Sequence, residues 1–123
     1  MALPLPHLNQ PDNEHLELER APLTGTVRYW EWNQPRIGEG VEISGNGLFI
    51  RTATVLPEGA HLTLRLELPA QPGMTVLGRV VRTVHGGKLS GAGMGIRFLD
   101  LTPEQHERIV SFVARRVSGE ARA

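Results

Sequence analysis

The residues that most often carry enzyme chemistry are few in this 123-residue chain, and their spacing does not suit catalysis. The chain has no cysteine, which excludes disulfides, thiolate zinc sites and cysteine nucleophiles. No serine lies in a Gly-x-Ser-x-Gly elbow, and no two of the five histidines have the His-x-x-x-His spacing of a zinc site. The segment Gly86-Gly87-Lys88 lacks both the earlier glycine and the following Ser or Thr of a phosphate-binding loop. We therefore expect a protein that is not an enzyme and holds no metal.

One short segment, residues 41–50 with the sequence VEISGNGLFI, combines polar side chains with a turn. Asn46 and Gly47 tolerate positive φ, and between two apolar runs they predict a tight β-hairpin. The hairpin alone explains Gly45, Asn46 and Gly47, although it gives Ser44 no special role beyond the frequency of serine in turns. The local pattern leaves open whether this turn is only a turn or also half of a binding site.

The charge balance and the apolar runs restrict the class of protein. Thirteen basic residues balance thirteen acidic ones, which argues against a general DNA, RNA or membrane binder. No apolar run approaches the roughly 20 residues that cross a bilayer, and the N-terminus has no basic and apolar regions typical of a secretory signal. We expect a cytoplasmic protein without membrane insertion.

Most of the chain has the period-two pattern of β-strands, and its last part has the pattern of a helix. The clearest strand is 62–68, where four leucines alternate with polar residues. The run 74–84 has adjacent apolar residues at Val80 and Val81, which suggests a β-bulge. The predicted strands are 26–32, 37–44, 48–54, 62–68, 74–84 and 94–99.

The C-terminal helix has a clear start signal. Thr102-Pro103-Glu104-Gln105 fits a capping box with proline at the first helical position. Ile109, Phe112, Val113 and Val117 then recur on one helical face. We expect a mainly β fold, a small antiparallel barrel with one C-terminal helix, at 16–117. A flexible arm at 1–15 and a tail at 118–123 flank it.

The order of several short motifs resembles the PilZ domain family over about residues 20–117. Residues 42–47, EISGNG, are similar to the family signature Asp/Asn-x-Ser-x-x-Gly. They are followed, in the order typical of the family, by the runs VLGRVVR at 76–82, GMGIRF at 93–98 and LTPE at 101–104. The resemblance implies a six-stranded antiparallel PilZ-type β-barrel with a C-terminal α-helix, which agrees with the strand pattern.

The same resemblance implies a ligand, cyclic di-GMP, and names candidate residues for it. In the family an Arg-x-x-x-Arg signature grips phosphate and guanine, and Arg20 matches its second arginine, whereas Leu16 stands at the first. Glu42, Ser44 and Gly47 match the second signature, although Glu42 is longer than the usual Asp or Asn. Loss of one charge-assisted contact costs about 1.5–3 kcal/mol. Arg28 and Arg51 are candidates to replace the missing arginine.

Two functions from different classes remain open. The first is an adaptor of bacterial signalling that does not bind cyclic di-GMP in the usual way and acts through protein partners in motility or cell polarity; Leu16 favours it. The second is a cyclic di-GMP receptor with an altered clamp. A third alternative is an unrelated β-barrel module.

Two tryptophans are the candidates for contact with a protein partner. Trp30 and Trp32 fall on one face of the first predicted strand, together with Arg28. Tryptophan and arginine are enriched in binding hot spots. The alternative is that both indoles cover the barrel core or the C-terminal helix, which is the commoner environment for tryptophan.

Overall fold

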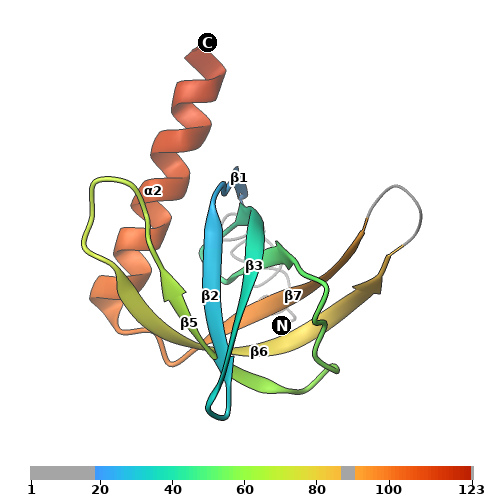
Figure 1. Ribbon diagram of the computed structural model, residues 1–123. Coiled ribbons are helices and arrows are strands. Elements are labelled where there is room, and N and C mark those ends of the chain that lie inside the picture. The colour runs from blue at the N-terminus through green and yellow to red at the C-terminus, as the bar shows by residue number, and fades with distance from the viewer. Residues whose placement is uncertain (1–18, 87–90, 123) are drawn as a thin grey trace, which may run out of the picture.

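A computed structural model of the chain describes residues 19–86 and 91–122, and Figure 1 shows a curved sheet with one long helix beside it. The N-terminal arm expected at 1–15 lies outside the described residues, as does most of the glycine-rich segment after His85. The elements are β1 (Ala21–Pro22), β2 (Thr26–Glu31), β3 (Gln34–Ile43), β4 (Gly47–Arg51), β5 (His61–Leu66), β6 (Met74–His85), β7 (Ala92–Leu99) and α2 (Pro103–Arg122).

The strands form one antiparallel sheet that closes on itself. Its order is β1-β3-β2-β5-β6-β7-β4, and an additional pairing of β3 with β4 joins its two sides. Six strands therefore make a barrel, and the two-residue β1 attaches to the end of β3, where Pro22 lies opposite Glu42. The predicted fold class, a six-stranded antiparallel barrel with a C-terminal helix, is confirmed.

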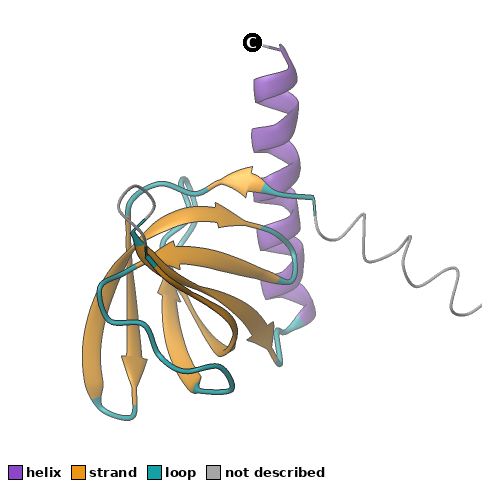
Figure 2. Cartoon of the chain, turned by 90° about the vertical axis from the view of Figure 1, so that its right-hand side faces the viewer, coloured by secondary structure: helices purple, strands orange, loops and turns teal. Residues whose placement is uncertain are grey.

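The core lies inside the barrel and under the helix. Leu62, Leu64 and Leu66 of β5 point inward, as their alternation predicts, and pack in the same cluster as the buried Ile109 and Phe112 of α2. Figure 2 shows the helix running along the barrel and continuing beyond it. Among the described residues, no helix is long and apolar enough to cross a membrane.

The predicted bulge in β6 is present. The register of β6 against β7 shifts between Val80 and Arg82, so Val81 is the extra residue and its side chain is 48% exposed. Because of this shift, Arg82 lies opposite Gly95. Without the extra residue, period-two alternation would direct the side chains at 80 and 82 to the same, inner face.

The helix begins as predicted but ends later. The Thr102 hydroxyl accepts a hydrogen bond from the Gln105 amide at 3.1 Å, and the Gln105 side chain accepts one from the Thr102 amide at 3.0 Å. This reciprocal pair is the predicted capping box. The tail expected from position 118 is helical as far as Arg122.

The first hairpin differs from the expected one. The strand β2 ends at Glu31, Trp32 and Asn33 form the turn, and β3 already includes Pro35. Trp32 has a φ of 58°, in the left-handed region that bulky residues rarely adopt. The expectation that Trp30 and Trp32 share a strand face was therefore wrong, because the chain reverses at Trp32.

Candidate ligand pocket

The four residues that the sequence suggested for ligand binding lie around one pocket on the outside of the barrel. Arg20, Glu42, Ser44 and Gly47 line a hollow of about 440 Å³. Closure of the barrel places residues of β6 and β7 on the other side of this pocket, because β4 pairs with β7 and β7 pairs with β6. The remaining lining residues are Ile43, Asn46, Leu48, Phe49, Val81, Arg82, Gly95, Ile96 and Arg97.

The loop between β3 and β4 forms part of the pocket lining. The Ser44 amide donates to the Gly47 carbonyl at 2.8 Å, and the Ser44 hydroxyl accepts a hydrogen bond from the Asn46 amide at 3.2 Å. The Asn46 carbonyl in turn accepts a bond from the Phe98 amide of β7 at 2.8 Å. Ser44 is 6% exposed, so its hydroxyl organises the loop and contributes little surface to the pocket.

Glycine is required at position 47 for a reason other than the one predicted. The predicted hairpin is present, since β3 and β4 pair antiparallel up to Ile43 opposite Leu48, but neither Asn46 nor Gly47 has the positive φ that the sequence suggested. Instead, a Cβ atom on Gly47 would collide with the carbonyl oxygen of Ile96, because β4 and β7 approach closely here. Gly47 therefore permits barrel closure at the pocket.

An ion pair links the two candidate signatures. The Arg20 guanidinium donates to the Glu42 carboxylate at 2.9 Å. The pairing of β1 with β3 explains this contact, since it holds Pro22 opposite Glu42 and so brings Arg20 alongside. The two side chains are 57% and 38% exposed, and an exposed pair of this kind contributes at most about 1 kcal/mol to stability.

Two further arginines, which were not predicted from the sequence, line the pocket. Arg82 follows the bulge and its guanidinium lies 5.2 Å from the centre of the Phe49 ring, a cation–π contact. Gly95 of β7 lies opposite both Phe49 and Arg82, so the strand pairings place these two residues on either side of it. Arg97 lies next along β7, opposite Gly47. In the sequence, the adjacent apolar residues Val80 and Val81 break the period-two alternation just before Arg82. This break was a sequence signal that could have identified Arg82.

The proposed substitutes for the missing arginine are not at this pocket. Arg28 lies 3.9 Å from Glu67, and Arg51 lies 3.9 Å from Glu39. Neither arginine lines the hollow. Arg82 and Arg97 are there instead.

The composition of the pocket suits binding and offers little for catalysis. It combines three guanidinium groups and one carboxylate with the apolar surfaces of Phe49 and Val81. Guanidinium groups bind phosphate oxygens and guanine edges through forked hydrogen bonds. Among residues 19–86 and 91–122, no cluster of metal-ligating side chains is found. An anionic ligand with a flat apolar portion would match this set of groups.

The two tryptophans lie on the β2–β3 hairpin, away from the pocket lining. Trp32 is 90% exposed at the tip of the hairpin. Trp30 is half-buried and lies opposite Pro35 of β3 and Thr63 of β5. Neither indole belongs to the buried core, so the alternative that both cover the core does not hold for the described structure.

Comparison with known proteins agrees with the fold. The family model described as PilZ domain matches residues 17–115. The structure of the Bacillus subtilis inhibitor of motility, MotI/DgrA, is similar with a TM-score of 0.73 and 17% identity, over 81% of this chain and 49% of that one. The chain thus spans about half the length of that protein.

The match to a second solved structure covers almost all of that structure's chain. It is the PilZ domain with c-di-GMP of YcgR from Escherichia coli, similar with a TM-score of 0.60 and 16% identity over 84% of this chain and 91% of that one. The PilZ domain of CeSA from a cellulose synthesizing bacterium is similar with a TM-score of 0.55 and 17% identity, over 83% and 97% of the two chains. None of the curated proteins matches the chain in sequence.

Proposed function

This chain belongs to the PilZ domain family, and on that premise we propose that it is an adaptor that does not bind cyclic di-GMP in the usual way. PilZ domains are signalling and binding modules without enzymatic activity. In this proposal the module acts in the bacterial cytoplasm through protein partners, in the regulation of motility or cell polarity. The similarity to an inhibitor of motility supports this choice of process.

The observation that carries the proposal is the ion pair between Arg20 and Glu42. Both residues stand at positions that the family uses to grip the nucleotide, and here they are closed on each other at 2.9 Å. A nucleotide that needs the full fork of the Arg20 guanidinium would compete with Glu42, which already accepts from one of its nitrogens. The usual partner arginine four residues earlier is absent, because Leu16 stands there. In this proposal the remaining clamp is incomplete, and its one arginine is paired with Glu42.

A specific observation favours a second candidate, a cyclic di-GMP receptor with an altered clamp. Arg82 and Arg97 line the same pocket as Arg20, so three cations face one carboxylate. A dianionic nucleotide would be attracted to this charge, and the Phe49 ring offers an apolar surface beside it. Under this second candidate, Arg82 and Arg97 replace the contacts that Leu16 cannot make.

Isothermal titration with cyclic di-GMP at moderate salt separates the two candidates. The adaptor proposal predicts no saturable heat for the wild-type chain. Saturable micromolar binding would contradict it, and the variants Arg82→Ala and Arg97→Ala would then show which cations serve the ligand. Loss of one such charged contact weakens binding about tenfold to a hundredfold. Arg51→Ala, an exposed arginine outside the pocket, is the matched control.

A further inference from the structure

The outer surface of the barrel carries a row of residues, four of five of them apolar, that crosses several strands. Strand registers place Trp30 opposite Thr63, Thr63 opposite Leu77, and Leu77 opposite Leu99. Pro35 lies opposite Trp30 at the other end. Because directly paired residues lie on the same face of a sheet, these five form one continuous row. We call it the outer row.

The outer row belongs to the exposed face of the sheet. The neighbouring residues along each strand, Tyr29, Leu64 and Val76, are buried in the core, so the row faces the opposite way. Leu77 has 47% of its surface exposed, and Trp30, Thr63 and Leu99 are half-buried. Ile37, which lies beside the row on β3, is 66% exposed. Clustered apolar side chains on an outer face are typical of interaction sites.

The charges on the two sides of the outer row differ. On one side the registers line up Arg97, Arg79 and His61. All three side chains are exposed, and within the described ranges Arg79 and Arg97 form no ion pair. This side presents positive charge that no carboxylate of the described chain neutralises.

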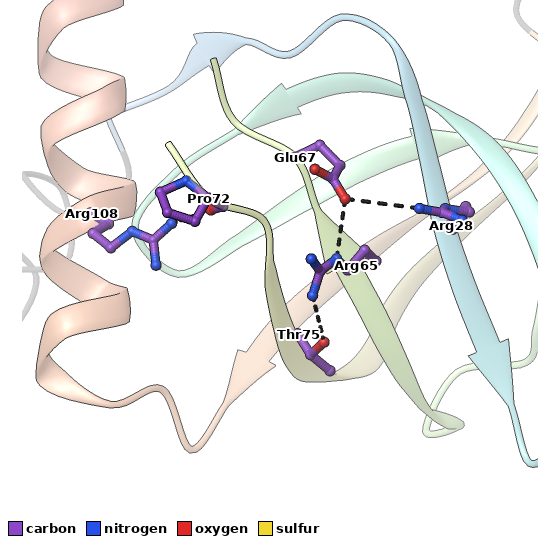
Figure 3. A network of polar contacts seen from close by, with 6 residues as sticks. All are labelled: Arg28, Arg65, Glu67, Pro72, Thr75 and Arg108. Carbon is purple, nitrogen blue, oxygen red and sulfur yellow. Dashed lines mark hydrogen bonds and ion pairs between the residues drawn. The ribbon is translucent and has the colours of Figure 1, made fainter. Parts of the chain in front are cut away.

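On the other side two arginines share one carboxylate. Arg65 donates to Glu67 at 3.1 Å and to the Thr75 hydroxyl at 3.2 Å, and Arg28 lies 3.9 Å from the same Glu67 carboxylate. Figure 3 shows Glu67 between the two arginines. The side of Arg79 and Arg97 therefore has the larger uncompensated charge, two guanidinium groups without a carboxylate partner among the described residues, whereas on the other side Glu67 balances one of two.

We propose that the outer row is the docking surface for a protein partner, and that this partner presents an acidic segment with apolar side chains. The proposal deepens the adaptor function above and rests on it. The apolar side chains of the segment would cover Trp30, Leu77 and Leu99, and its carboxylates would pair with Arg79 and Arg97. Charge complementarity selects the acidic segment, since a basic one would face two unpaired guanidinium groups.

A nuclear magnetic resonance titration of the full chain tests this proposal. The probe is the acidic peptide EELFESLEE, and the comparison is its basic counterpart KKLFKSLKK. We expect saturable shifts of the Trp30 indole N–H and of the Leu77 and Leu99 amides with the acidic peptide, and none with the basic one. Shifts with neither peptide, equal shifts with both, or shifts confined to the pocket would overturn the proposal.

Variants of exposed residues make the test specific. Leu77→Ser and Arg79→Glu should each weaken binding of the acidic peptide about tenfold, the size of effect expected at an interface hot spot. The matched controls are Val110→Ser, whose side chain is 38% exposed on α2, and Arg115→Glu, which is exposed on the same helix. The controls should bind as the wild type does. Arg97 is left unchanged because it also lines the pocket.

Two further arms separate this proposal from its alternatives. In the first, vesicles of phosphatidylcholine with phosphatidylglycerol are added in place of the peptide. If the vesicles broaden the outer-row signals while the acidic peptide does not shift them, the surface binds membranes and the proposal is wrong.

In the second, cyclic di-GMP is added alone, with the Ser44 and Gly47 amides as the readout. Tight nucleotide binding there would contradict the adaptor function but would leave a positive peptide result on the outer row in place.

Discussion

At the scale of single residues, the pocket shows where the sequence was informative and where it was not. Ser44 and Gly47 were selected by their resemblance to a signature, and the structure places both in the pocket lining, Ser44 in the β3–β4 loop and Gly47 at the start of β4. The reason for glycine was not predictable, because the collision with the Ile96 carbonyl depends on how β4 and β7 meet. Arg97 was not predictable for the same reason, since only barrel closure brings it to Gly47.

The substitution Gly47→Ala tests this role of Gly47. The added Cβ would meet a backbone oxygen, which cannot rotate away, so we expect a loss of about 1–3 kcal/mol in the free energy of unfolding. Urea denaturation measures it. Gly119→Ala is the matched control, because nothing lies within 4 Å of its Cβ position and Ala favours a helix by about 1 kcal/mol. An unchanged midpoint for Gly47→Ala would show that β4 and β7 are not this close.

At the scale of elements, local chemistry predicted the helix start and the bulge but not the first hairpin. The capping box depends only on residues 102–105, so the sequence was sufficient. The hairpin turn has a tryptophan in the left-handed region, which no propensity rule suggests. Pro35 also fits its strand only because β3 has β2 alone beside it there, and β4 begins to pair at Glu39.

The substitution Thr102→Ala tests the capping box. It removes the hydroxyl that accepts a hydrogen bond from the Gln105 amide, and we expect a loss of about 1 kcal/mol in the free energy of unfolding. Thr63→Ala, a half-buried threonine in the middle of β5, serves as a control for the change of side chain outside the helix. Equal stability of Thr102→Ala and the wild type in urea would mean that the cap contributes nothing to anchoring α2.

At the scale of the whole molecule, the barrel presents two different surfaces that meet at Arg97. One is the pocket, in which Arg20 forms an ion pair with Glu42. The other is the outer row, where apolar side chains lie beside unpaired positive charge. The fold class could be read from alternation and motif order, whereas this arrangement of charges required the registers of the closed sheet.

The central claim is that this PilZ domain has lost its usual ligand because its clamp is incomplete. Titration of the variant Leu16→Arg with cyclic di-GMP, beside the wild type, tests it most directly. Restoring the arginine adds a charge-assisted contact of about 1.5–3 kcal/mol, which raises affinity about tenfold to a hundredfold. We predict no saturable heat for the wild type and measurable binding for Leu16→Arg. Micromolar binding by the wild type, with no gain in the variant, would contradict the claim.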